Sequence, residues 1–229
     1  MLSVLDFGYY NMDCMEGMKQ FPDKYFDLAI VDPPYGIHQS GGKNKTRGRV
    51  AKATDYPDYA GNDLKPPDQE YFDELFRVSK NQIIWGGNHM ISRFPFDSSC
   101  WIVWDKKNGN TDFADAELAW TSFDGAVRIF AYTWSGMRQE NMKEKEKRIH
   151  PNQKPVDLYL WILNTFLKKY DLTGWKILDT HVGSASSLIA FHEMNLDFVG
   201  FELDKYYYDL SKKRYEAETA QLNIFEVGL

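Results

Sequence analysis

The chain has 229 residues, enough for one domain with a buried core, since domains commonly run to about 100–200 residues. Its net charge of −6 argues against a general binder of polyanions, and its apolar runs are too short to span a bilayer. Cys14 and Cys100 form neither a CxxC motif nor a Cys/His cluster, so we predict no disulfide and no metal site. The N-terminus does not resemble a secretory signal, which favours a cytoplasmic protein.

Short apolar runs alternate with helical patterns, which predicts one α/β domain over residues 1–229 with a mainly parallel sheet. Branched and aromatic residues predict seven strands, over residues 27–31, 82–86, 100–104, 117–121, 127–134, 176–179 and 197–202. Helices are expected over 67–80 and 154–170, after Ser184, and from Asp204, which suits an N-cap.

Two segments interrupt this alternation. Residues 36–54 contain no acid and carry five basic residues, Lys43, Lys45, Arg47, Arg49 and Lys52. A basic, glycine-containing loop in an acidic protein favours local contact with phosphates, although a solvated loop is the simpler alternative. The second segment, 136–153, has mixed charge and fits equally well a solvated connector or an element that contacts substrate.

The first predicted strand ends in an unusual turn, Asp32-Pro33-Pro34-Tyr35. Proline fixes φ and restricts the preceding residue, so the turn holds the Asp32 carboxylate and a backbone carbonyl at a set angle. Because proline has no N–H, the turn offers acceptors that suit an –NH2 group, and Tyr35 offers a flat face to a ring. A tight turn without any ligand is the alternative.

A second junction, residues 177–187, ends a strand at Asp179 and opens a helix with a Gly-Ser turn. Gly183 lets the backbone approach a ligand closely. The segment matches neither GxGxxG nor GxxxxGK[ST], which disfavours pyrophosphate or triphosphate. A cofactor with a ribose and a cationic centre fits better, with Glu202 at the next strand end placed to accept the ribose hydroxyls.

These motifs together resemble amino-group DNA methyltransferases that use S-adenosylmethionine and place the catalytic half before the cofactor half, the β-type order. The matching blocks occur in family order: NMDCMEGMKQFPDKYFDLAIVDPPYG, IIWGGNH, WIVWDKKNGNTDFADAELAWTSF, HPNQKP and ILDTHVGSASSLIAFHEMNLDFVGFELDKYYYDLSKKR. The resemblance implies a circularly permuted, Rossmann-like methyltransferase fold. Its seven-stranded, mostly parallel sheet would have one antiparallel strand and helices on both faces.

The resemblance also implies residue roles. The catalytic tetrapeptide corresponds to Asp32, Pro33, Pro34 and Tyr35. Cofactor binding is assigned to Asp13 near the adenine amino group, Glu202 at the ribose, and Lys154, Pro155, Asp179, His181, Gly183 and Ser184 around the pocket. Two positions depart from the family pattern. His181 replaces an aromatic residue, and Ala185 replaces a glycine, which requires either a negative φ or strain.

In this family, Asp before Pro-Pro-Tyr is mostly associated with adenine N6, so the resemblance implies methylation of a flipped-out adenine in duplex DNA. Cytosine N4 is the alternative base. The basic loop would hold the DNA backbone through Lys43, Lys45, Arg47 and Arg49. Sequence recognition is assigned to a small insertion at about 133–150, where Arg138, Gln139 and Asn141 are candidates for reading base edges.

Three other functions are less well supported. An amino-methyltransferase acting on RNA is the nearest. A non-catalytic nucleic-acid-binding module is compatible with the altered cofactor loop but not with the intact tetrapeptide. A nicotinamide dehydrogenase shares the α/β pattern but needs a phosphate loop that this sequence lacks. The sequence leaves open the recognition site, a homodimer, a restriction endonuclease partner, and whether the host is a bacterium or a phage-infected one.

Overall fold

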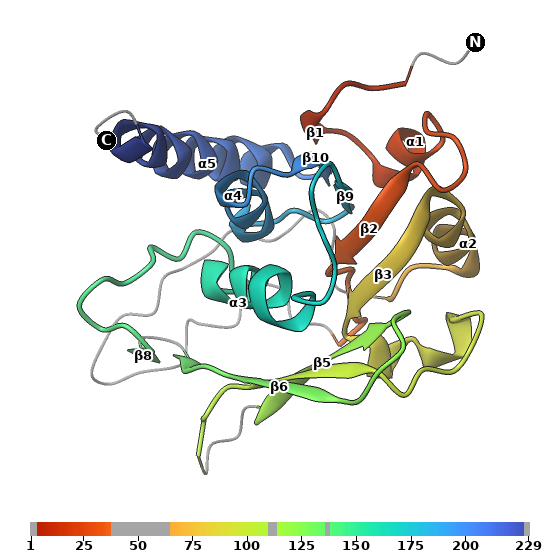
Figure 1. Ribbon diagram of the computed structural model, residues 1–229, viewed down its shortest axis with the longest axis horizontal. Helices are drawn as coiled ribbons and strands as arrows, with labels where there is room; N and C mark the ends of the chain where they lie inside the picture. Colours follow the sequence, from red (N-terminus) through yellow and green to blue (C-terminus); the bar gives the residue numbers. More distant parts are fainter. Residues whose placement is uncertain (1–3, 38–64, 110–113, 136–137, 227–229) are drawn as a thin grey trace.

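The computed structural model describes residues 4–37, 65–109, 114–135 and 138–226. Its central sheet has eight strands in the order β1-β10-β9-β2-β3-β5-β4-β6 (Figure 1). These are β1 (Gly8–Asn11), β2 (Phe26–Val31), β3 (Ser79–Trp85), β4 (Trp101–Asp105), β5 (Ala116–Thr121), β6 (Arg128–Ala131), β9 (Lys176–Asp179) and β10 (Asp197–Glu202). The two short strands β7 (Trp134–Ser135) and β8 (Arg138–Gln139) form a separate antiparallel pair.

The strand directions confirm the expected fold class. β5 runs antiparallel to its neighbours β3 and β4, and the other pairings within the large sheet are parallel. The predicted strand 127–134 is divided, because the chain leaves β4 after Ala131 and forms β7 separately. The eighth strand, β1, was not predicted. It pairs with β10 from Gly8 to Asn11.

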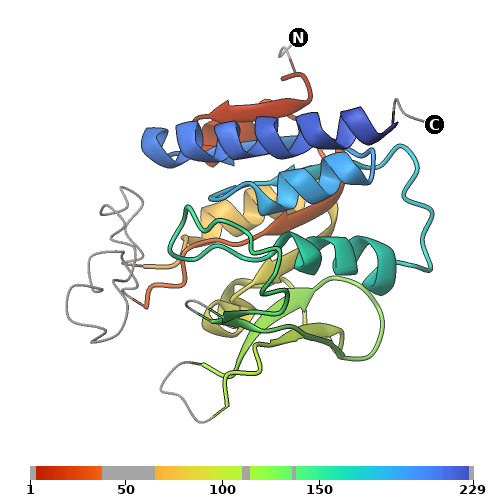
Figure 2. The ribbon, with the colours of Figure 1, turned by 90° about the vertical axis from the view of Figure 1, so that its left-hand side faces the viewer.

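Helices cover both faces of the sheet. They are α1 (Cys14–Met18), α2 (Gln69–Val78), α3 (Val156–Trp161), α4 (Ser186–Glu193) and α5 (Lys205–Glu226); a π-helical turn, η4 (Ile162–Phe166), continues α3, and the 3-10 turns η2 (Gly87–His89) and η3 (Ile91–Arg93) follow β3. From top to bottom, α5, α4 and α3 lie in front of the sheet in Figure 2, whereas α1 and α2 lie to the right in Figure 1. None of the described helices is long and apolar enough to cross a membrane.

The side chains of β2 show how the two cores arise. Leu28 and Ile30 pack with residues of α3 and α4, while Ala29 and Val31 pack with residues of α1 and α2. Successive side chains of a strand point to opposite faces, so a continuous apolar strand is buried on both sides. Asp204 caps α5 as predicted, with its Oδ1 accepting the N–H groups of Tyr206 at 2.9 Å and Tyr207 at 3.2 Å.

The sheet topology brings the two unusual junctions together. β9 pairs with β2, with Leu28 opposite Ile177, and both strands run in the same direction. Their carboxyl ends therefore meet at one edge of the sheet, where ligands of open α/β sheets commonly bind. Asp32 directly follows β2, and Asp179 ends β9.

Candidate active site

The Asp32 carboxylate is held from both sides. Its Oδ1 accepts the hydroxyl of Tyr35 at 2.5 Å, and its Oδ2 contacts the ammonium of Lys154. Pro33 is buried and the Asp32 side chain is 20% exposed, so the carboxylate lies at the rim of the protein interior. The turn thus fixes an acceptor whose two oxygens already have donors.

The Tyr35 ring lies between two features of the segment after β3. It stacks on His89 with ring centroids 5.3 Å apart and an interplanar angle of 14°. Gly86 has a φ of +66°, and a Cβ there would come within 2.1 Å of the Tyr35 ring. Burial and the nearby Asp32 carboxylate raise the pKa of the Tyr35 hydroxyl well above its ordinary value, so it remains a donor.

Lys154 is the second donor to Asp32, and this differs from the expected cofactor role. The Lys154 side chain is 5% exposed, and its ammonium also lies 3.2 Å from the Glu117 carboxylate of β5. Glu117 is in turn paired with Lys106. Burial alone raises the pKa of Glu117, but Lys154 and Lys106 lower it to about 2. Sequence reasoning missed Glu117, whose only signal is an acid within an apolar strand.

The loop after β9 uses both oxygens of Asp179 internally. Oδ1 accepts the N–H of His181 at 3.0 Å and Oδ2 accepts the hydroxyl of Ser187 at 2.5 Å. Burial raises the pKa of Asp179 to about 7. This carboxyl therefore shapes its own loop, and it does not line the neighbouring cavity described below.

Two residues of this loop have left-handed backbones. Gly183 has a φ of +55°, and its N–H donates to Glu202 Oε2 at 2.9 Å. Ala185 has a φ of +63° and a fully buried side chain, so of the two expected outcomes the structure shows strain. An alanine in this region costs about 1–2 kcal/mol relative to glycine. The altered loop keeps the turn by accepting that strain.

A cavity of about 290 Å³ opens beside the tetrapeptide. Its lining comprises Met12, Asp13, Cys14, Met15, Pro34, Pro67, Asp68, Glu70, Tyr71, Thr180, His181, Glu202 and Leu203. Four of these residues are acids, and burial lowers the pKa of His181 to about 4, so its ring is neutral. Among these described lining residues none is a cation, which favours a positively charged ligand over a phosphate.

Three of the predicted cofactor residues line this cavity: Asp13, His181 and Glu202. Asp13 also caps α1, accepting the N–H of Met15 at 2.7 Å. Five others lie outside the lining, namely Lys154, Pro155, Asp179, Gly183 and Ser184. Pro34 of the tetrapeptide is part of the wall. A larger hollow of about 490 Å³, between α1 and α2, contains none of the predicted site residues.

The apolar part of the cavity wall was missed by sequence reasoning. Tyr71 comes from α2, its hydroxyl lies 2.6 Å from Thr180 Oγ1, and its ring meets His181 edge-on with centroids 5.5 Å apart. Met12, Met15 and Leu203 follow β1 and β10. Helical apolar spacing in α2 is typical of any core-facing helix, so the sequence contained no signal that would single out Tyr71.

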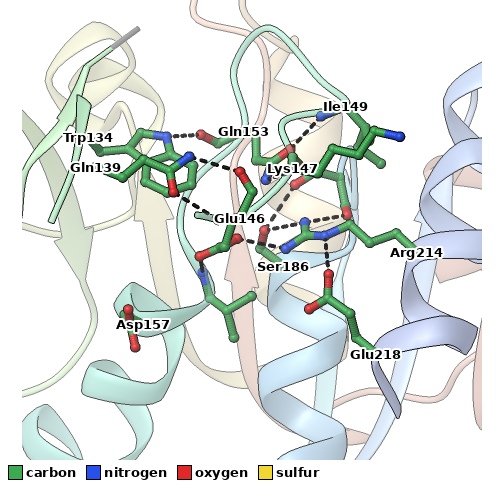
Figure 3. Close-up of polar contacts among 12 residues, drawn as sticks. Trp134, Gln139, Glu146, Lys147, Ile149, Gln153, Asp157, Ser186, Arg214 and Glu218 are labelled. Carbon is green, nitrogen blue, oxygen red and sulfur yellow. Dashed lines mark hydrogen bonds and ion pairs between the residues drawn. The ribbon is translucent and has the colours of Figure 1, made fainter. Parts of the chain in front are cut away.

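Residues 138–153 are tied through Glu146 to the loop that follows β9, the predicted cofactor loop (Figure 3). One oxygen of Glu146 accepts the N–H of Val156 at 3.0 Å, at the start of α3, and the other meets Arg214 of α5 at 2.7 Å. Arg214 also donates to the carbonyl of Ser184 and to the hydroxyl of Ser186, each at 2.9 Å. The segment is therefore anchored to both the cofactor loop and the helix that follows Lys154.

Gln139, predicted to read base edges, lies in the protein interior. Its amide nitrogen donates to the Glu146 carbonyl at 2.9 Å, and its amide oxygen accepts the Glu146 N–H at 2.9 Å. Asn141 is exposed, but its oxygen accepts N–H groups of Lys143 and Glu144 within a turn. Arg138 is exposed. The proposed phosphate-contacting residues Lys43, Lys45, Arg47, Arg49 and Lys52 lie outside the described residues.

Comparison with known proteins agrees with this geometry. The type II methyltransferase M2.MboI of Moraxella bovis is 23% identical over 253 residues, which cover 95% of this chain and 90% of that protein. TTHA0409 of Thermus thermophilus, described as a DNA modification methylase and complexed with S-adenosyl-L-methionine, has a TM-score of 0.56 at 17% identity. The alignment covers 92% of this chain and 95% of that one.

A second solved structure, the cytosine-N4-specific PvuII DNA methyltransferase, has a TM-score of 0.55 at 11% identity, covering 96% of this chain and 93% of that one. At these identities the structures establish the fold. The family itself follows from sequence, because a family model described as DNA methylase matches residues 79–213, more than half of the chain. The chain therefore belongs to the N6/N4 DNA methylase family.

Proposed function

We propose that this DNA methylase transfers a methyl group from S-adenosylmethionine to the N6 amine of an adenine that has left the DNA duplex. The observation that carries the proposal is the shared wall between two sites. Pro34 borders the acidic cavity, and Asp32, two residues earlier, presents a fixed carboxylate. The amine that accepts the methyl group and the cationic methyl donor would thus meet at one turn of the chain.

The cavity suits S-adenosylmethionine chemically. Its acids attract the sulfonium charge, and Glu202 at the end of β10 is placed to accept ribose hydroxyls. The cavity also offers apolar contact to the adenine ring of the cofactor, through Met12, Met15 and Leu203. These lining residues disfavour a nicotinamide dinucleotide, whose phosphates would face four carboxyl groups.

The chain's own residues align the acceptor amine. The amine would replace the Tyr35 hydroxyl on Asp32 Oδ1, and the Pro33 carbonyl would accept its second N–H. Drawing both hydrogens into acceptors favours a tetrahedral nitrogen with an available lone pair. When bound, S-adenosylmethionine supplies a methyl group whose bond to sulfur breaks as the nitrogen–carbon bond forms, and the amine releases one proton to solvent. Alignment of the reacting groups contributes much of the rate.

Cytosine N4 is the second candidate. Its exocyclic amine also stands beside a ring nitrogen and would present the same donors to Asp32. The assignment to adenine is supported by the aspartate at the first position of the tetrapeptide. To reach Asp32, either base must leave the duplex, which costs a few kcal/mol and is offset by stacking and hydrogen bonds in the pocket.

The experiment that tests the function is incubation with isotopically labelled S-adenosylmethionine and mixed-sequence duplex DNA, followed by mass spectrometry of the nucleosides. Labelled N6-methyladenine is the expected product. Labelled N4-methylcytosine would keep the reaction and change the base. Label in RNA but not in DNA would change the proposed substrate from DNA to RNA. No label in either nucleic acid would contradict the proposal.

The proposal extends to partners. Duplex DNA in a bacterial cytoplasm is the proposed substrate, and a restriction endonuclease acting on the same site would be its functional counterpart. Because the proposed recognition segment, at about 133–150, is short, two copies of the chain would share recognition. Sedimentation with and without duplex DNA tests the homodimer, since a complex of one copy per duplex would contradict it.

Glu202 makes cofactor binding depend on pH. Burial raises the pKa of Glu202 to about 7, although hydrogen bonds from the N–H groups of Asp204 and Gly183 lower it. The carboxyl is protonated below that pH and ionised above it, and a cation binds the ionised form better. We expect the Kd for S-adenosylmethionine, measured by calorimetry, to be about tenfold higher at about pH 6 than at about pH 8.

Two variants interpret that measurement. Glu202→Gln should bind more weakly and lose the pH dependence. Glu70→Gln removes an acid of the same cavity whose side chain is 76% exposed, and it should keep the dependence. A pH dependence that survives Glu202→Gln would assign the titration to another group.

The basic loop gives a test on DNA binding. Replacing Lys45 and Arg47 with Glu should weaken binding and flatten its salt dependence, because each lost phosphate contact reduces the slope by about 0.9. The control variant replaces Lys168 and Lys169, exposed residues beyond α3, with Glu. The measurement is the dissociation constant for duplex DNA across a range of salt concentrations, for wild type and both variants. An unchanged slope in the loop variant would favour a solvated loop.

A further inference from the structure

Four charged side chains form a row of alternating sign beside the tetrapeptide. Lys106 contacts Glu117, Glu117 contacts Lys154, and Lys154 contacts Asp32. They come from four separate parts of the chain: the end of β4, β5, the segment before α3, and the turn after β2. Lys154 is the most buried member, with 5% of its side chain exposed.

A row of buried charges contributes little to the stability of a fold, because each charge loses hydration. Burying an ammonium costs several kcal/mol, and replacing a buried ion pair with apolar residues is often neutral or stabilising. Lys154 nevertheless sits among rings, 5.4 Å from the centroid of Trp85 and 5.7 Å from that of Tyr35. Burial lowers the pKa of Lys154, but Asp32 and Glu117 raise it above its ordinary value, so it stays an ammonium.

We infer that Lys154 is a positioning residue for Asp32, and that Glu117 positions Lys154. The inference rests on the function proposed above. Lys154 occupies Oδ2 of Asp32, so that Oδ1, which now accepts the Tyr35 hydroxyl, is the oxygen available to the substrate amine. A cation on one oxygen also fixes the rotation of the carboxylate and offsets repulsion from the neighbouring carboxylates Glu117 and Asp179.

Glu117 has a separate part in this arrangement. It is a second carboxylate on Lys154, so the ammonium is shared between two carboxylates and does not neutralise Asp32 alone. Its position is fixed by the pairing of β5 with β4, where Glu117 lies opposite Trp104. Lys106 supplies the second cation that Glu117 needs when partly buried.

The chain offers a matched pair of variants. Lys154→Met and Lys106→Met each remove one cation from Glu117, but only Lys154 contacts Asp32. We expect Lys154→Met to lower kcat for methyl transfer about 100-fold, as loss of one preorganised charged contact does. Lys106→Met should stay within about threefold of wild type, and Lys154→Arg should recover part of the lost rate.

Two readouts distinguish positioning from a structural role. The Kd for S-adenosylmethionine should change less than about threefold in Lys154→Met, because Lys154 does not line the cavity. Lys154→Arg, which returns a cation to Asp32 Oδ2, should recover part of the kcat that Lys154→Met loses, whereas a purely structural defect would not follow the charge.

The outcomes separate this inference from the proposed function. If wild type methylates DNA and Lys154→Met retains its kcat, or if Lys154→Arg recovers none of the lost rate, the inference is wrong while the function stands. If wild type transfers no label to any nucleic acid, both are wrong. Should Lys154→Met fail to fold, Glu117→Gln is the second variant, with an expected fall in kcat of about tenfold, and a wild-type rate there overturns the inference.

Discussion

Asp32→Ala will lower methyl transfer at least about 1,000-fold and leave the Kd for S-adenosylmethionine within about threefold of wild type. The variant removes the acceptor that Tyr35 and Lys154 hold in place, and Asp32 is not part of the cavity lining. The measurement is single-turnover transfer of labelled methyl to duplex DNA, with cofactor binding by calorimetry on the same preparation.

Asp32→Asn separates the charge from the shape. It keeps an acceptor oxygen but faces the Lys154 ammonium with no negative charge, so we expect a loss close to that of Asp32→Ala. Strong residual methylation by Asp32→Ala would remove the proposed acceptor role, whereas strong residual methylation by Asp32→Asn would show that an acceptor oxygen suffices without the charge. Loss of cofactor binding together with transfer would show that the turn supports the cavity through more than Pro34.

Gly86→Ala will reduce kcat at least about 100-fold and destabilise the fold by about 2–4 kcal/mol. The new Cβ would lie 2.1 Å from the Tyr35 ring, and the φ of +66° is strained for alanine. Tyr35 must then move, which disturbs both its stacking on His89 and its hydrogen bond to Asp32. Thermal melts and steady-state kinetics on one preparation measure the two effects.

Gly174→Ala is the matched control for backbone strain. Gly174 has a φ of +71°, and a Cβ there would meet no atom within 4 Å. It should cost about 1–2 kcal/mol through conformation alone and leave kcat unchanged. If Gly86→Ala cost no more than this control and kept its kcat, the position of the Tyr35 ring would not matter for transfer.

Most of the sheet was predictable because its strands are apolar on both faces. β2 contains the apolar run LAIV and β9 the apolar pair IL, each between charged residues, and the structure places both strands within one residue of the expected bounds. β1 was missed because GYYN is short, begins with glycine, and gains its strand conformation from pairing with β10. Tertiary pairing of this kind leaves little local signal.

The candidate site was predictable in part for a similar reason. Asp32 and Glu202 stand at strand ends, where residue type and position together indicate a ligand. Lys154 was expected at the cofactor, but it contacts the carboxylate of Asp32. The contact was not predicted because a motif gives a residue's place in the chain but not its partner. Gln139 looked like a base reader, yet it binds the backbone of Glu146, a contact that only the fold creates.

The pairing of β2 with β9 has a consequence for folding. Leu28 lies opposite Ile177, and Gly8 lies opposite Val199, so strands made early in synthesis gain these neighbours only when the last third of the chain is complete. Non-local parallel pairing is intrinsically slow and leaves apolar edges exposed meanwhile. The turn at Asp32 is thus translated early but assembled late, so a truncated or stalled chain would carry Asp32 without Lys154 and without Glu202.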